Sequence, residues 1–300
     1  MIAFIALTAG MAVIAIGVFL SGAARGGLGN TALPYDLNKN AVGSYVAAGL
    51  VMAYALGVVQ RRGRLKRALQ VAALIELAGV FSTLSRGSIL GSIVALTAVS
   101  LLLRRNRVIT LVLVSVVAVG YVATNGIDSR AERDQAKAGS YDSSEVRVQS
   151  FQGAITKIKE KPLLGTGGGT YHDTLPGIDG GTFVVPDPNN MFLLTLAELG
   201  LLGCVALLAL LSRFGRLLID VARLPEAAAV PAVAAGCVSL SLFVHFQVDI
   251  TWTRGTTSLA FAMIGLMMAI LRLSRETPPA RPPTPAASST ISHAVPAGVA

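Results

Sequence analysis

The chain has 300 residues, of which 53% are hydrophobic and 14% are charged, and its mean hydropathy is +0.65. Soluble domains carry roughly a quarter charged residues, so this composition excludes an ordinary soluble protein and predicts an integral membrane protein. The formal net charge of +9 does not indicate nucleic-acid binding, because the basic residues follow the loops between apolar segments.

Eight apolar segments approach the length needed to cross a bilayer, which is about 20 helical residues for a core of about 30 Å. They are 2–20, 41–59, 68–84, 88–103, 108–124, 190–211, 226–246 and 255–273. The first precedes a Ser-Gly-Ala-Ala run that resembles a signal-peptidase site, although a transmembrane helix is the preferred interpretation. No segment alternates with a period of two. The prediction is an all-α, polytopic membrane helical bundle of about eight transmembrane helices with a large extracytoplasmic loop.

Basic residues concentrate in alternate loops of this bundle. Thirteen Lys and Arg residues, with three acidic residues nearby, fall in 61–67, 104–107, 212–224 and 272–276. The other set of loops carries 11 basic and 11 acidic residues. This asymmetry is the positive-inside signal, and it predicts that the four basic segments and both termini are cytoplasmic. The segments expected outside are 21–40, 85–87, 125–189 and 247–254.

The chain is expected to divide into four parts. They are membrane helices at 1–124, an extracytoplasmic loop with a short helix at 125–189, membrane helices at 190–273, and a disordered cytoplasmic tail at 274–300. The tail is rich in Pro, Ala, Ser and Thr and cannot bury a core.

The long loop carries helix signals at 143–162, with a serine cap at its start and Pro162 at its end. Its apolar stripe would comprise Val146, Phe151, Ile155 and Ile158. Three lysines near its end, Lys157, Lys159 and Lys161, could face lipid phosphates. A glycine-rich segment follows at 165–171. Glycines let backbone N–H groups converge on an anion, so a phosphate-binding nest and a mobile hinge both stay open.

Two arginines lie in the outer hairpins between apolar spans. Arg86 stands in Leu-Ser-Arg-Gly (84–87), and an arginine so close to hydrocarbon is a functional candidate. The alternatives for it are snorkelling to headgroups and a structural ion pair. Arg254 follows His245, Asp249 and Trp252 in the last hairpin. There an Asp249–Arg254 pair beside an interfacial Trp is the simpler interpretation.

Two acidic residues are buried by position. Glu76 lies near the middle of the span at 68–84, and Glu198 lies about two turns into the span at 190–211. Each would be protonated or paired with an arginine. A proton or ion pathway would need more such residues, which weakens a transporter interpretation. Cys204 and Cys237 lie in apolar spans and are interpreted as packing residues, so we expect no disulfide and no metal site.

Four motifs lie at 36–47, 84–91, 145–171 and 189–203. Their order resembles that of the O-antigen ligase and O-antigen polymerase superfamily. They resemble, in turn, an Asn/Lys-Asn-x-x-Gly helix start, a Ser-Arg-Gly hairpin, an Arg-containing helix followed by Pro-Leu-Leu-Gly-x-Gly, and a His-Asn-x-x-Leu segment with a downstream Glu-x-Gly. The resemblance covers roughly residues 36–205, with a weaker match to the final hairpin.

The resemblance implies a multi-pass glycosyltransferase of the bacterial inner (cytoplasmic) membrane. Its donor would be a polyprenyl-diphosphate-linked glycan, and its acceptor a sugar hydroxyl on a glycan or glycolipid at the outer face, among membrane lipids. No metal or other cofactor and no nucleic acid is implied. Arg86 and Arg147 occupy the positions that bind the donor diphosphate, since guanidinium forks match phosphate oxygens. Asn190 and Arg254 are further substrate-binding candidates.

The chain departs from the family pattern at Asn189, where the family has its proposed base histidine. An amide can orient a hydroxyl but cannot accept its proton at neutral pH. Asn189 is therefore the candidate that positions the acceptor, and His172 and Asp187 are candidates that take its proton. Family members usually have several more N-terminal helices, so a truncated or reduced member stays open. The alternative functions are a non-catalytic membrane subunit of a polysaccharide-assembly complex and a transporter.

Overall fold

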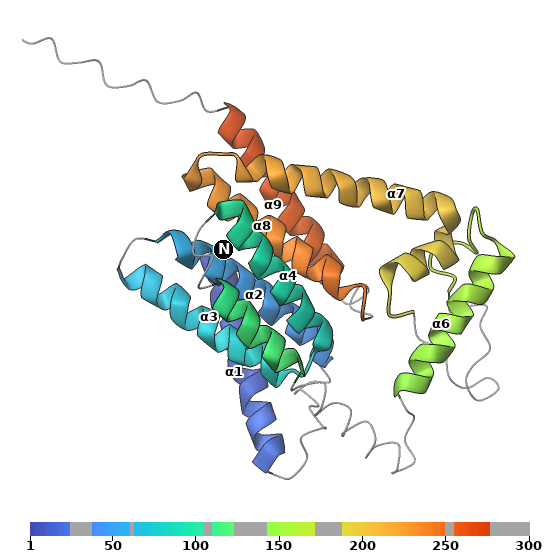
Figure 1. The fold of residues 1–300 in the computed structure, drawn as a ribbon, viewed down its shortest axis with the longest axis horizontal. Helices are drawn as coiled ribbons and strands as arrows, with labels where there is room; N and C mark the ends of the chain where they lie inside the picture. The colour runs from blue at the N-terminus through green and yellow to red at the C-terminus, as the bar shows by residue number, and fades with distance from the viewer. Residues whose placement is uncertain are drawn as a thin grey trace, which may run out of the picture.

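The computed structural model describes residues 1–24, 38–60, 63–104, 110–122, 143–171, 188–249 and 255–276 (Figure 1). Every regular element among them is helical. The long helices are α1 (Ile2–Ala24), α2 (Lys39–Val59), α3 (Arg64–Ser82), α4 (Arg86–Leu103), α6 (Ser143–Glu160), α7 (Met191–Ala222), α8 (Glu226–His245) and α9 (Thr257–Glu276). A shorter apolar helix spans Thr110–Val122. The all-helical prediction is thus confirmed for the described residues.

Six of these helices are long and apolar enough to cross a membrane, namely α1, α2, α4, α7, α8 and α9. α3 coincides with a predicted span, but it carries Lys66, Arg67 and Glu76. Helix Thr110–Val122 covers another predicted span and extends about 20 Å of the roughly 30 Å required. The protein is therefore a multi-pass membrane protein, and the count of eight spans stays a prediction. The predicted tail after Glu276 and the loop residues 125–142 and 172–187 lie outside the described part.

The centre of the bundle is formed by α2 and α8. α2 packs against α1, α3, α4 and α8, and α8 also packs against α4, α7 and α9. Both central helices are rich in Ala, Gly and Ser. Small residues let helix backbones approach closely where lipid supplies no hydrophobic driving force between helices. The central position of this pair therefore follows from its composition.

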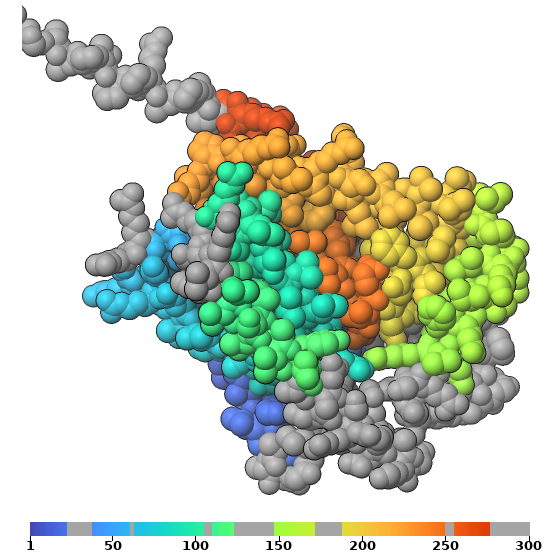
Figure 2. Space-filling view, in the orientation of Figure 1, coloured from blue at the N-terminus to red at the C-terminus, as the bar shows by residue number. Residues whose placement is uncertain are grey.

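α7 covers one edge of the molecule, and α6 lies beside its first part (Figures 1 and 2). The outer face of α7 is apolar, with Leu201 50%, Leu202 62% and Val205 55% exposed. Such a face is suited to lipid tails rather than to water. Among the described residues, α6 packs against α7.

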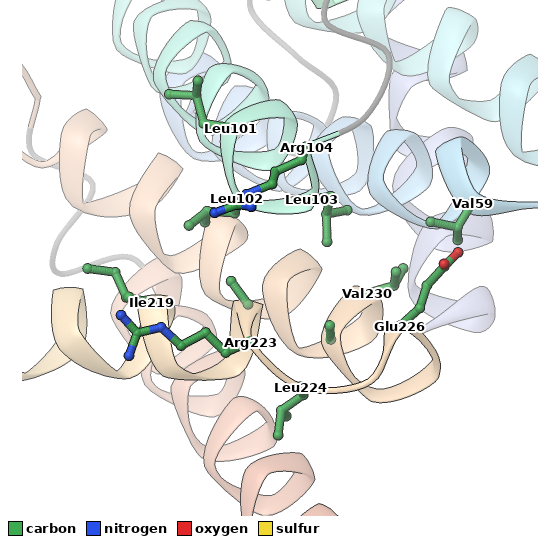
Figure 3. A pocket seen from close by; sticks show the side chains of 12 residues that line it. Val59, Leu101, Leu102, Leu103, Arg104, Ile219, Arg223, Leu224, Glu226 and Val230 are labelled. Atoms are coloured by element: carbon green, nitrogen blue, oxygen red, sulfur yellow. The ribbon is translucent and has the colours of Figure 1, made fainter.

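The bundle has two opposite ends. The starts of α2 and α4 meet the end of α8, because Ser44 and Ser88 contact His245. At the opposite end, a cavity of about 620 Å³ lies between the end of α4, the end of α7 and the start of α8. Figure 3 shows Arg104 and Arg223 extending from the first two of these elements. We call this the basic end, because described residues of the basic segments gather there, as the alternation of loop charge predicts.

Candidate functional site

Two helix starts place cationic residues at the end opposite the basic end. Asn38 caps α2, since its side-chain oxygen accepts hydrogen bonds from two backbone N–H groups at 2.8 and 3.3 Å. Ser85 caps α4 by accepting a hydrogen bond from one backbone N–H at 3.4 Å. A cap fixes the residue at which a helix begins. Lys39 and Arg86 are consequently the first residues of their helices.

A cavity of about 210 Å³ is formed where these helix starts meet α6, helix Thr110–Val122 and the segment after α8. It brings together Arg86 and Arg147, the two arginines predicted to bind the donor. Lys39 is a third cation in its lining, and Asp249 is its carboxylate. The other lining residues are Asn40, Leu84, Gly87, Leu90, Tyr121 and Val248. We call this space the arginine cavity.

The arginine cavity has the chemistry of an anion-binding site. Three cations face one carboxylate in its lining. Guanidinium groups can bind phosphate oxygens in pairs, and an ammonium adds a point charge. The first turns of α2 and α4 line the cavity, and the positive ends of helix dipoles favour anions. Its volume is below the roughly 300–1,000 Å³ of sites that enclose drug-sized ligands. It therefore suits a headgroup such as a diphosphate and not an entire glycan.

The start of α7 is tied to the segment that follows α8. The side-chain oxygen of Asn190 accepts a hydrogen bond from a backbone N–H of the first turn at 3.0 Å, and its amide nitrogen donates to the carbonyl of Gln247 at 3.1 Å. Asn190 therefore has both polar groups engaged within the protein, and its role in substrate binding stays a prediction. The half-buried Asn189 precedes it, near the segment that leads to Asp249 of the arginine cavity.

The glycine-rich segment after α6 docks into a break in α7. The break lies at Gly200, whose φ of 63° and ψ of −162° are accessible essentially to glycine alone. The N–H groups of Thr166 and Gly167 donate to the carbonyls of Ala197 and Glu198 at 3.0 and 2.8 Å, and two N–H groups after the break donate back to the segment. The N–H groups of Thr166 and Gly167 donate to α7 carbonyls, so these two groups are not available to bind a phosphate.

The helix predicted at 143–162 is present as α6, but Lys157 on it is buried in the protein and does not face lipid. Lys157, expected to face lipid phosphates, is 2% exposed. Its ammonium donates to the carbonyl of Thr170 at 2.9 Å and to that of Tyr171. It also lies 4.9 Å from the centre of the Tyr171 ring. The prediction for Lys157 is therefore wrong, because the docked segment supplies carbonyl acceptors on that face; Lys159 and Lys161 are exposed.

The two acidic residues predicted to be buried differ. Glu76 is fully buried, and its carboxyl oxygen accepts a hydrogen bond from the Thr8 hydroxyl of α1 at 2.6 Å. Glu198 is only partly buried, because the break at Gly200 leaves it beside the docked segment. There it accepts a hydrogen bond from the backbone N–H of Tyr171 at 3.1 Å. Each thus has a neutral donor as its partner rather than an arginine.

Three predicted site residues, His172, Asp187 and Arg254, lie outside the described residues. Conversely, sequence reasoning did not assign Lys39, Asp249 or His245 to the site. Lys39 and Asp249 stand within motifs that the sequence did single out, so a signal existed for both. His245 stands in the same hairpin motif as Asp249, but the sequence could not show its contacts, because the serines it contacts are 201 and 157 positions away in the chain.

Comparison with known proteins gives one family match. Residues 71–208 match the family model described as O-antigen ligase. No curated protein matches the chain. The matched range includes Arg86, Arg147, Asn189 and Asn190, and it confirms the family that the order of motifs predicted. Residues 71–208 of this multi-pass membrane protein are therefore similar to the O-antigen ligase domain and support the O-antigen ligase/polymerase superfamily.

Proposed function

We propose that this protein is a membrane glycosyltransferase of the O-antigen ligase or polymerase type, located in the bacterial inner membrane. It transfers a glycan from a polyprenyl diphosphate to a sugar hydroxyl on a glycan or glycolipid acceptor. The observation that carries the proposal is the arginine cavity, which joins Arg86 and Arg147 although they lie on different helices. Both arginines lie in the range that matches the O-antigen ligase family model.

The cations of the arginine cavity are proposed to hold the donor diphosphate. Transfer breaks the bond between the anomeric carbon and a phosphate oxygen, and the diphosphate departs with the electron pair. Cations that are fixed before the reaction stabilise such a leaving group without reorganisation. Arg86 and Arg147 supply forked donors, and Lys39 supplies a point charge from the start of α2. This chemistry requires no metal or other cofactor.

The acceptor side is proposed to involve the start of α7. Asn189 orients the acceptor hydroxyl by hydrogen bonding, and Asn190 and Arg254 contribute to substrate binding. His172 and Asp187 are the loop residues proposed to take the proton. Asn190 supports this arrangement by holding the start of α7 against Gln247, two residues before Asp249. The comparison of Asn189→His, His172→Ala and Asp187→Ala in one transfer assay tests these roles, and indifference to all three changes refutes them.

A transporter is supported less well by the described residues. Their fully buried titratable side chains include Glu76, Lys157 and His245. Glu76 contacts α1, Lys157 contacts the segment docked on α7, and His245 contacts α2 and α4. These surroundings are separate and do not form a line across the bundle. A non-catalytic subunit is the alternative that the Asn189 departure favours, and it predicts that the unaltered protein transfers no glycan.

The decisive experiment measures glycan transfer in membranes of a strain that lacks its own copy of the protein. We expect Arg86→Ala and Arg147→Ala each to lower the rate about 100- to 1,000-fold, the usual cost of one transition-state donor. The lysine variants should also be impaired, because an ammonium cannot form the fork. Arg213→Ala is the matched control, since Arg213 is exposed near the basic end. Unaltered transfer in both alanine variants would refute the proposal.

A further inference from the structure

His245 is a buried histidine at the end of α8, beside the arginine cavity. Its side chain is 1% exposed. Nδ1 lies 2.8 Å from the hydroxyl of Ser44 in α2 and 3.4 Å from that of Ser88 in α4. The ring thus joins the three helices whose ends surround the cavity. Nε2, in contrast, has no hydrogen-bond partner among the described residues.

The surrounding hydroxyls determine which ring nitrogen carries the proton. The Ser44 hydroxyl donates its single hydrogen to the carbonyl of Asn40 at 2.9 Å. The Ser88 hydroxyl donates to Ser85 at 2.8 Å. When both hydrogens are used in this way, Nδ1–H is the donor in the short contact with Ser44. The neutral ring is then the tautomer in which Nε2 is unprotonated and carries a lone pair.

This nitrogen is near the carboxylate of the arginine cavity. Nε2 lies 4.0 Å from Oδ2 of Asp249, a distance for an ion pair but too long for a hydrogen bond. The ring also packs on Gly87, a cavity-lining residue, so closely that a Cβ at this position would overlap it. Joining the helices requires only Nδ1. It does not explain the buried Nε2, which lowers the stability of the folded state while it has no hydrogen-bond partner.

We propose that Asp249 and His245 form the proton-accepting pair of the transfer reaction, an inference that rests on the proposed function. Asp249 lines the cavity and receives the proton from the acceptor hydroxyl. Rotation of its carboxylate toward Nε2 passes the proton to His245, and the resulting imidazolium pairs with the Asp249 carboxylate. The negative end of the α8 dipole adds to this stabilisation. In this arrangement the pair takes the place of His172 and Asp187 as the proton acceptor, which an amide at Asn189 cannot be.

A bond to the acceptor oxygen replaces the bond to phosphate, and the acceptor proton moves to His245. The oxygen–hydrogen bond of the acceptor breaks, and its oxygen forms a bond to the anomeric carbon of the donor glycan. The bond from that carbon to the phosphate oxygen breaks, and the electron pair leaves with polyprenyl diphosphate, which Arg86 and Arg147 hold. The proton resides on His245 until it is released to solvent before the next turnover.

Amide substitutions separate this role from a structural one. In His245→Asn, the amide group occupies the neighbourhood of Nδ1 and can keep the link to Ser44. In His245→Gln, it reaches toward the position of Nε2. Neither amide accepts a proton, so we expect kcat to fall about 100- to 10,000-fold in both variants and in Asp249→Asn. KM for the polyprenyl-diphosphate donor should change little, because the arginines that bind it are intact.

The assay uses the full chain in membranes at matched protein levels, with Asp220→Asn near the basic end as the carboxylate control. Wild-type kcat in His245→Asn and Asp249→Asn would overturn the pair. If the histidine variants do not accumulate, the isosteric Asp249→Asn decides alone. If transfer is lost in Arg86→Ala but is unchanged in Asp249→Asn, only the proton-accepting pair is overturned. A wild type without transfer activity overturns the proposed function and the pair together.

Discussion

At the scale of single residues, helix caps determine where charge is presented in this protein. Asn38 and Ser85 set the first residues of α2 and α4, and these are Lys39 and Arg86. The carboxamide of Asn190 does the same for α7 and also binds the segment after α8. Sequence patterns could nominate Arg86 and Arg147 singly, because each stands in a motif. They could not show that the two share a cavity, since this depends on how α4 and α6 are placed.

Loss of the Asn190 cap is expected to destabilise the protein. Asn190→Ala removes both hydrogen bonds, and an N-cap is worth about 0.5–2 kcal/mol. Asn190→Asp keeps the acceptor for the first turn of α7 and loses only the donor to Gln247, so it should retain more stability. Thermal unfolding in detergent measures both changes. Equal unfolding temperatures for Asn190→Ala and the wild type would show that the cap contributes nothing to stability.

At the scale of elements, α7 shows where sequence reasoning succeeded and where it did not. An apolar span was predicted at 190–211, and the helix begins as expected at Met191 but extends to Ala222. The end was misplaced because Arg213 and Arg216 read as a loop, whereas an exposed helix end accommodates charge. The break at Gly200 was not predicted either. Its cause is the docked segment from 162–167, whose hydrogen bonds replace those that α7 loses.

Replacement of Gly200 should disturb both the break in α7 and the docking of the segment on it. A Cβ in Gly200→Ala would overlap the backbone of Leu163, and the backbone conformation itself disfavours alanine by about 1–3 kcal/mol. We therefore expect faster hydrogen exchange at 162–171 and lower glycan transfer, because α6 carries Arg147. Gly215→Ala is the matched control, since its Cβ would meet no atom within 4 Å. Equal exchange in the two variants contradicts the docking role.

At the scale of the whole molecule, the positions of the two cavities follow from the direction of three helices. α2 and α4 start where α8 ends, so the arginine cavity and the basic end lie at opposite ends of the bundle. Alternation of loop charge was enough to predict which segments share an end. It was not enough to predict the central position of α2 and α8, which depends on the packing of small residues along their whole length.

The orientation of the bundle is testable with single cysteines. Cys204 and Cys237 are first replaced by alanine, and one exposed residue is then changed in Arg64→Cys, Glu276→Cys or Lys161→Cys. The positive-inside signal predicts that an impermeant maleimide labels only Lys161→Cys in intact cells, and that it labels the other two once the membrane is opened.

The reverse pattern would place the arginine cavity on the cytoplasmic side. A donor headgroup displayed at the outer face could not then reach Arg86 or Arg147, and the proposed transfer would fail for lack of access, whatever chemistry the cavity offers. Labelling of Lys161→Cys in intact cells, together with protection of Arg64→Cys, is therefore the result that the proposed function requires. This experiment needs neither the sugar nor the acceptor to be known, so it can be done before any transfer assay.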